Sequence, residues 1–233
     1  MFLIIIIIMN NKILPDEAKV IIIGGGIIGC SVAYHLTKFG WKDVVLFERD
    51  QLTSGTTWHA AGLVSQLGPS AAITKIRKYS LDLYKNLEKE VKHSAGLRLN
   101  GALSIAQTDS RWQELKRQAT TAQLYNVDIN ILNKDEIKKK YPMMQNKDLK
   151  GGVLIPGDGA ADPSGVTYML AKAARQGGAK IYEKSPVEKI LTRNRRVHGV
   201  KVSGKEIKAE YIVLATGMWS RQIGNEIGVS IPL

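Results

Sequence analysis

A glycine-rich turn directly after an apolar run constrains this 233-residue chain more than any other feature. Residues 20–23 are β-branched and apolar, and they lead into Gly24, Gly26 and Gly29 in the spacing G-x-G-x-x-G. In that spacing the first glycine permits a tight turn, the second lets the backbone approach a pyrophosphate, and the third lets the next helix pack closely on the sheet. The pattern therefore predicts a strand, a turn and a helix whose free N-terminal N–H groups bind a dinucleotide.

A second apolar run, residues 44–47, ends at Glu48. An acidic residue about 20 positions beyond the turn accepts hydrogen bonds from ribose hydroxyls in such units. Within the helix, Ile28, Val32 and Leu36 recur every four residues and predict the stripe that faces the sheet. Together these features form a β-α-β unit and predict an α/β fold with a Rossmann-like nucleotide-binding domain.

The glycine spacing alone does not distinguish NAD from FAD, and the next segment carries that distinction. Residues 48–63 read E-R-D-Q-L-T-S-G-T-T-W-H-A-A-G-L, and further matching positions lie at residues 156–159, 162–163 and 215–219. These segments resemble the dimethylglycine and sarcosine dehydrogenases, within the D-amino-acid-oxidase-like group of FAD enzymes. The resemblance implies a Rossmann-like FAD-binding domain of the GR2 type, with part of an α+β substrate domain inserted.

The most specific part of the resemblance is T-T-W-H-A-A-G-L, residues 56–63. In the resembled dehydrogenases the matching histidine is bonded covalently to the 8α-methyl group of FAD, which implies that His59 is the attachment residue. A neutral imidazole is a good nucleophile near neutral pH, where the side chain is only partly protonated. The alternative is that His59 packs or forms hydrogen bonds in a loop. The resemblance also implies cofactor contacts for Val187 and Trp219, with ordinary strand and core roles as the alternatives.

The residues predicted to bind the cofactor come from the turn, the end of the second strand, the loop around His59 and two later segments. They are Gly24, Gly26, Ile27, Ile28, Gly29, Glu48, Arg49, Gly55, Thr56, Thr57, Trp58, His59, Ala60, Ala61, Gly62, Leu63, Val187, Gly217 and Trp219. The sequence identifies no catalytic acid or base and no set of metal ligands.

The order of the predicted elements divides the chain into three parts. We expect the first part of the FAD-binding domain at 10–95 and the start of a substrate domain at 96–150, which opens with a strand pair over residues 97–107, broken at Asn100-Gly101. The chain then returns to the FAD-binding domain at 151–233, where residues 211–215 are expected to form a buried parallel strand. Because the resembled enzymes continue much further, we interpret the chain as an N-terminal fragment.

The N-terminus and the composition exclude several classes of protein. Residues 1–9 are apolar but far shorter than the roughly 20 residues that span a bilayer. We expect them to be a spurious extension, with Met9 as the true start, or a short leader. The net charge of +12 comes mostly from dispersed lysines, which argues against nucleic-acid binding. The single cysteine, Cys30, fits a reducing compartment, either the cytoplasm or, in a eukaryote, the mitochondrial matrix.

The resemblance implies an FAD-dependent dehydrogenase that oxidises N-methylated glycine derivatives, such as dimethylglycine or sarcosine, by hydride transfer to a histidyl-linked flavin. An electron-transfer flavoprotein would take the electrons, and tetrahydrofolate would trap the one-carbon unit if a folate domain follows. Two alternatives stay open. One is an amino-acid or glycine oxidase of the same fold that uses oxygen, and the other is a non-catalytic regulatory relative, which is expected to lack the attachment histidine.

Overall fold

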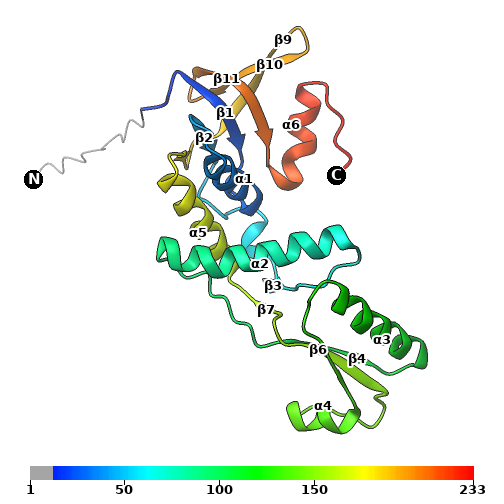
Figure 1. Ribbon diagram of the computed structural model, residues 1–233. Helices are drawn as coiled ribbons and strands as arrows, with labels where there is room; N and C mark the ends of the chain where they lie inside the picture. Colours follow the sequence, from blue (N-terminus) through cyan, green and yellow to red (C-terminus); the bar gives the residue numbers. More distant parts are fainter. Residues whose placement is uncertain (1–12) are drawn as a thin grey trace, which may run out of the picture.

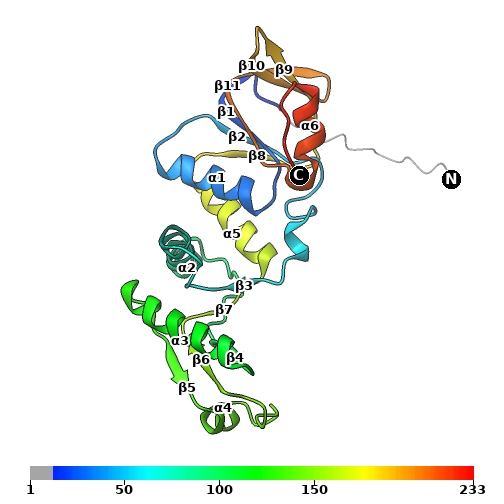
Figure 2. The ribbon, with the colours of Figure 1, turned by 90° about the vertical axis from the view of Figure 1, so that its right-hand side faces the viewer.

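The computed structural model describes residues 13–233. The expectations about residues 1–9, including Met9 as the start, lie outside these residues. The described chain is elongated, with a larger sheet and its helices at one end, a smaller sheet with two helices at the other, and a narrow connection between them (Figures 1 and 2). Between residues 13 and 233, no helix combines the length and the apolar character needed to cross a membrane.

The larger sheet has six strands, and the central ones are parallel, as the β-α-β pattern predicts. The first two strands are buried along residues 20–23 and 44–47, because helices or other strands cover both of their faces. The last two strands continue the sheet in the antiparallel sense. In spatial order the strands are β8 (Lys180–Tyr182), β2 (Val44–Phe47), β1 (Glu17–Ile23), β11 (Lys205–Leu214), β10 (Arg196–Val202) and β9 (Val187–Arg193).

The second half of β11 differs from the buried strand expected at residues 211–215. It pairs in parallel with β1, as predicted, but Tyr211 is 47% exposed and the residues after it are only half-buried. β10 pairs with residues 205–208 alone, and among the described residues no strand lies beside the second half on the side opposite to β1. One edge of the sheet is therefore open next to the carboxyl end of β11.

The first helix, α1 (Ile27–Lys38), packs against the core through small side chains, with Val32 and Leu36 of the expected apolar stripe half-buried against the same cluster. Cys30 and Ala33 are fully buried, whereas Ile28 is 64% exposed. The expected stripe is therefore wrong at Ile28. The reason is close packing, since a Cβ atom at Gly29 would lie 1.9 Å from a carbonyl oxygen of the turn. The start of the helix therefore lies too close to the sheet for a large side chain to fit between them.

Three further helices complete the larger unit. α5 (Pro163–Gln176) lies beside α1, and α2 (Ala71–Val91) lies across one end of α5 (Figure 1). On the opposite face of the sheet, the short helix α6 (Ser220–Glu226) packs through Ile223. The helices thus leave the carboxyl ends of the parallel strands uncovered.

The smaller sheet has three antiparallel strands in the order β4–β6–β5, covered by α3 and α4. The expected strand pair over residues 97–107 is wrong, since only residues 102–106 form a strand and their partner is a later segment. The chain does turn at the expected break, where Gly101 has a φ of +85°, but the two halves do not pair with each other. These elements are β4 (Ala102–Ala106), α3 (Asp109–Leu124), β5 (Asn130–Leu132), α4 (Lys134–Lys140) and β6 (Gly151–Ile155).

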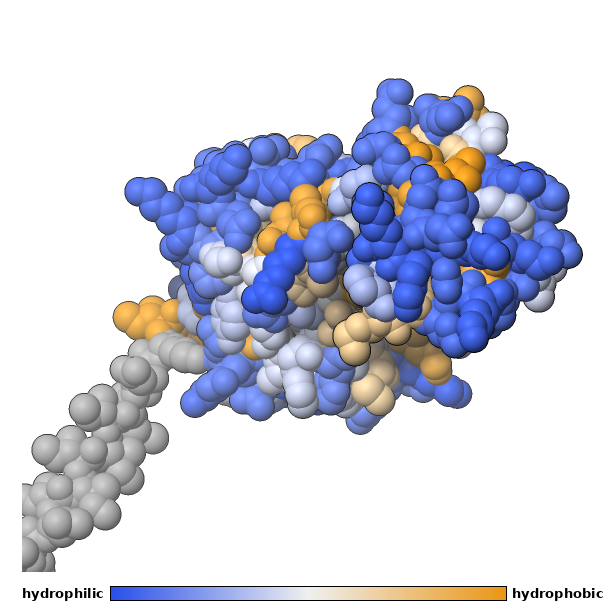
Figure 3. Space-filling model, turned by 90° about the horizontal axis from the view of Figure 1, so that it is seen from below, coloured by the Kyte–Doolittle hydropathy of each residue, from blue (hydrophilic) through white to orange (hydrophobic). Residues whose placement is uncertain are grey.

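A two-stranded sheet of β3 (Leu63–Val64) and β7 (Gly159–Ala160) lies between the two units in both ribbon views (Figures 1 and 2). β3 follows the loop around His59, and β7 belongs to the chain that returns from the smaller sheet. Seen from the end opposite to the larger sheet, hydrophilic side chains predominate and hydrophobic residues gather only in small patches (Figure 3). The pairing of β3 with β7 therefore joins the two units through backbone hydrogen bonds.

Candidate functional site

A cavity of about 560 Å³ opens where β1, β2 and β11 end. In open α/β sheets this edge, outside the carboxyl ends of the strands, is where ligands bind. The structure brings most of the predicted cofactor residues together there. Those that line the cavity are Gly24, Gly26, Ile27, Ile28, Glu48, Arg49, Gly55, Thr56, Thr57, Val187, Gly217 and Trp219.

The glycine turn forms one wall of the cavity and has no room for side chains. Gly24 has a φ of +111°, and a Cβ atom there would lie 2.4 Å from the carbonyl oxygen of Ala215. The backbone of the turn therefore lies directly against the cavity. This is the arrangement that a pyrophosphate requires, because its oxygens must approach N–H groups within hydrogen-bond distance.

Three N–H groups of the turn already have partners, and that of Gly24 donates to the carbonyl oxygen of Phe47 at 2.8 Å. Gly25 donates to Glu48 Oε2 at 2.6 Å, and Ile27 donates to Thr57 Oγ1 at 3.1 Å. The N–H groups of Gly26 and Ile28, which line the cavity, have no hydrogen-bond acceptor among the described residues. They lie at the positive end of the α1 dipole, so this wall fits an anionic group.

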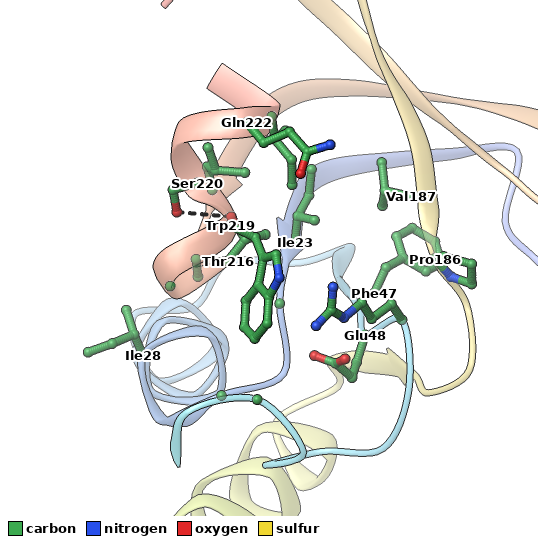
Figure 4. Close-up of a pocket in the computed structure, with 18 of the residues that line it drawn as sticks. Ile23, Ile28, Phe47, Glu48, Pro186, Val187, Thr216, Trp219, Ser220 and Gln222 are labelled. Atoms are coloured by element: carbon green, nitrogen blue, oxygen red, sulfur yellow. Dashed lines mark hydrogen bonds between the residues drawn. The ribbon is translucent and has the colours of Figure 1, made fainter. Parts of the chain in front are cut away.

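Glu48 occupies the end of β2, opposite the start of α1 (Figure 4). Its Oε1 atom accepts from the N–H of Asp50 at 3.0 Å, while Oε2 accepts from the turn. A carboxylate oxygen can accept more than one hydrogen bond, so both atoms retain capacity for a ribose hydroxyl. The role predicted for Glu48 is compatible with its position.

Trp219 projects from the 3₁₀ turn η2 (Gly217–Trp219) into the middle of the cavity, between Ile28 and Glu48 (Figure 4). The Arg49 guanidinium lies 4.0 Å from the centre of the indole ring, within the range of a cation–π contact. Trp219 is therefore a wall of the cavity and not a core residue. Farther along, Pro186 and Val187 add an apolar surface, on which a flat ring such as adenine fits.

The loop that carries His59 lies beside this cavity and is exposed. Thr57 is buried in the 3₁₀ turn η1 (Thr57–His59), but Trp58, His59, Ala60 and Ala61 are exposed. The rings of Trp58 and His59 lie 3.8 Å apart, centre to centre. The imidazole forms no hydrogen bond to any described residue. Trp58, His59 and Ala61 thus border the cavity region without lining it, where the imidazole is accessible to a ligand.

A second cavity, of about 320 Å³, lies on the other side of this loop. Ala60, Gly62 and Leu63 line it, and Ile27 lines both cavities. Its polar side chains are Ser65 and, from one face of α2, Arg77, Ser80 and Tyr84, which follow helical spacing. Burial raises the pKa of the Tyr84 hydroxyl. The loop around His59 therefore separates two adjoining cavities.

Comparisons with known proteins identify the group to which this fold belongs. The family model described as FAD dependent oxidoreductase matches residues 19–233. The chain belongs to this family. Human mitochondrial sarcosine dehydrogenase is 39% identical over 96% of this chain and 25% of that protein, and human mitochondrial dimethylglycine dehydrogenase is 37% identical over 94% and 25%. The mouse mitochondrial pyruvate dehydrogenase phosphatase regulatory subunit is 36% identical over 94% and 25%.

Among solved structures, L-proline dehydrogenase from P. horikoshii has a TM-score of 0.86 and 28% identity, over 94% of this chain and 58% of that protein. The chain spans about a quarter of the length of the curated relatives named above. Within this family the residues of the first cavity fit FAD, because the turn offers free N–H groups, Glu48 offers acceptors and the far end offers an apolar surface. Gly29, which lines neither cavity, contributes by keeping α1 close to the turn.

Sequence reasoning missed part of the site. Thr216 and Ser220, whose hydroxyl oxygens lie 2.9 Å apart, line the first cavity with Gln222 (Figure 4). The sequence feature that could have indicated these residues is their position just after the last parallel strand. Arg77, Ser80 and Tyr84 line the second cavity, and only their shared helix face could have indicated them. Within residues 13–233, no group of three or more histidine, cysteine or acidic side chains could hold a metal ion.

Proposed function

We propose that this chain is the FAD-binding part of a dehydrogenase that oxidises a secondary or tertiary N-methylamine of glycine, and that FAD is bonded covalently to His59. One observation carries the proposal: an exposed imidazole lies on the loop that borders both the dinucleotide cavity and a second cavity. The names of the two human relatives, sarcosine dehydrogenase and dimethylglycine dehydrogenase, support the substrate class.

In this proposal each wall of the first cavity has a separate task. The N–H groups of Gly26 and Ile28 bind the pyrophosphate, Glu48 accepts from the ribose, and Val187 lies against the adenine. Arg49 and Trp219 contact the cofactor between these points. The ring system then extends past Thr57 toward His59, which places it at the boundary of the second cavity.

When bound, FAD would supply the redox chemistry by accepting a hydride from a carbon next to the amine nitrogen. The residues of this chain would hold and orient the cofactor and exclude water from one side of it. Residues 96–150 would begin the substrate domain. Electrons would leave to an electron-transfer flavoprotein, and tetrahydrofolate would trap the one-carbon product in a further domain.

A regulatory role is the second candidate, because the phosphatase regulatory subunit is almost as similar to this chain as the two dehydrogenases. His59 favours the enzyme, since a protein without redox chemistry gains nothing from a reactive imidazole at the cofactor. The two candidates differ in a measurable property. Only the enzyme would reduce an artificial electron acceptor when an N-methylated glycine is added.

The test uses the complete reading frame that contains this chain. After precipitation in acid and digestion, we expect yellow fluorescence to stay with the peptide that contains His59. His59→Ala should release all flavin to the supernatant, whereas the control His93→Ala should retain it. Flavin that is released from the unaltered protein would contradict covalent attachment, and an absence of dye reduction by dimethylglycine and sarcosine would contradict the substrate class.

A further inference from the structure

Asp158 is the one charged side chain that is fully buried in the part of the chain that the structure describes, with 3% of its surface exposed. Its Oδ1 atom accepts from the N–H of Gln66 at 2.8 Å and lies 3.4 Å from the Gln66 side-chain amide. Burial raises the pKa of the carboxyl, while the hydrogen bonds from Gln66 and the charge of Arg77 act in the opposite direction. Burying a carboxylate is costly unless it is paired, so this position calls for a specific role.

Gln66 belongs to the segment that follows the His59 loop, and this segment is held firmly. Arg77 donates to the carbonyl oxygen of Leu67 at 2.6 Å, and Gly68 donates to Thr74 Oγ1 at 3.0 Å. Residues 58–61 differ from this segment, because they are exposed and make few contacts with the rest of the described chain. The position of the loop is therefore determined by its two ends.

The near end of the loop is fixed by Thr57, which accepts from the N–H of Ile27 in the dinucleotide turn. The far end is fixed by β3, Gln66 and their partners on the returning chain. The N–H of Ala161 donates to the carbonyl oxygen of Gly62 at 2.8 Å, next to the pairing of β3 with β7. Asp158 lies directly before β7 and, among the described residues of the returning chain, is the only one whose side chain bonds to this end.

The main chain around Asp158 also joins the segment that leaves the larger unit. The Asp158 carbonyl oxygen accepts from the N–H of Gly101 at 2.8 Å. Ala160, in β7, exchanges two hydrogen bonds with Arg98, at 2.8 and 3.0 Å. Three segments therefore meet at Asp158 and β7: the His59 loop, the outgoing chain and the returning chain (Figures 1 and 2).

Glycines allow these three segments to pack backbone against backbone. A Cβ atom at Gly159 would lie 1.9 Å from the carbonyl oxygen of Arg98, and one at Gly62 would lie 2.2 Å from that of Ala161. No side chain separates the segments, so a shift of one backbone moves the next. Through this junction, the position of the returning chain determines the position of the loop.

We infer that Asp158 is a positioning residue which, through Gln66, fixes the far end of the His59 loop and so sets the place of the imidazole relative to the dinucleotide cavity. This inference rests on the proposed attachment of FAD to His59. The carboxylate lines neither the first nor the second cavity and has no bond to the imidazole. It acts on the loop, and its loss should slow attachment without weakening non-covalent binding of FAD.

The experiment measures the rate at which apoprotein, made from the complete reading frame, incorporates FAD covalently in air, where dioxygen reoxidises the reduced flavin that remains when the 8α carbon loses a proton and bonds to the imidazole. Asp158→Ala should slow this rate at least about tenfold, because a hydrogen bond to a buried charged group is lost. Asp158→Asn keeps an acceptor oxygen for the Gln66 N–H and should stay within about threefold. The exposed residue Asp128 offers a matched control, and Asp128→Ala should attach FAD at the unaltered rate.

A second readout separates positioning from general loss of structure. In a His59→Ala background, which binds FAD only non-covalently, Asp158→Ala should change the dissociation constant of FAD by less than about threefold. Attachment at the unaltered rate in Asp158→Ala would overturn the inference. So would a parallel loss of attachment and of FAD affinity, because that result would mean that Asp158 only maintains the fold.

Hydrogen exchange tests the same inference without a variant and without covalent flavin. The amide of Gln66 should exchange as slowly as the amides of β7, and much more slowly than those of residues 58–61. Exchange of Gln66 as fast as that of the exposed loop would overturn the inference. If the unaltered protein holds no covalent flavin, the proposed attachment fails, but this measurement still decides whether Asp158 fixes the loop.

Discussion

The glycine turn and the His59 loop lie side by side at the same cofactor site, yet they are built in opposite ways. The core of the turn is local: Gly29 lies so close to the carbonyl oxygen of Gly24, within the same motif, that no side chain fits. The loop is long-range, since its near end bonds to a residue 30 positions away and its far end to one 92 positions away. Recognition of phosphate is thus contained in one short motif, whereas the place of the reactive imidazole depends on the whole fold.

The largest expected effect comes from breaking the turn with Gly29→Val. The new side chain would overlap the carbonyl oxygen of Gly24, and backbone cannot move away as a flexible side chain can. We expect a loss of more than about 3 kcal/mol in the free energy of unfolding, measured in urea. Gly55→Ala is the control, because its Cβ would lie at an ordinary 3.4 Å from the Trp219 ring. Equal stability of the two variants would show that α1 is less tightly packed than the structure indicates.

Thr57→Val tests the bond that joins the turn to the loop. The substitution keeps the shape of the side chain but leaves the Ile27 N–H without its acceptor. We expect the protein to lose about 1–2 kcal/mol of stability, as when a helix cap is removed. Thr57→Ser retains the hydroxyl and should lose less than half as much. A Thr57→Val protein as stable as the unaltered one would remove this link between the two regions.

Trp58→Ala tests the exposed part of the loop. More than half of the Trp58 surface is exposed, so its removal should change the free energy of unfolding by less than about 0.5 kcal/mol. Thermal and urea unfolding would measure this. A loss as large as that of Thr57→Val would mean that the loop contributes to the core and that the two regions differ less than the structure indicates.

Cys30 offers the most sensitive probe of the turn, because no reaction of its thiol is expected while the protein is folded. The thiol is buried in α1, and burial raises its pKa to about 12, so at pH 8 the reactive thiolate is absent. A disulfide reagent such as Ellman's should react with Cys30 only after urea unfolds the protein. Rapid reaction in the native protein would show that the turn and α1 open readily, as we expect only of the loop.

The sequence predicted the local part of this architecture well. The strand, turn and helix around the glycine spacing follow from rules that act within about ten residues, and the family resemblance extended them to FAD. The errors have a different origin. Ile28 was assigned to the sheet-facing stripe because helical period alone does not show how closely a helix approaches a sheet, and Cys30 and Ala33 face it instead.

The long-range part could not be predicted from one sequence. The expected strand pair over residues 97–107 failed because Arg98 pairs with Ala160, a residue of the returning chain. Arg77 and Asp158 become meaningful only when the fold brings them next to the segment after His59. Such contacts leave no spacing in the sequence, since their partners lie in separate elements.

The open second half of β11 has a consequence for handling this protein. A strand with one unpaired edge, and with Tyr211 half-exposed on its face, offers its free N–H and carbonyl groups to any other extended chain. During synthesis and refolding this edge is a template for aggregation. Low concentration, and a partner segment supplied in the same polypeptide, would therefore increase the yield of soluble material.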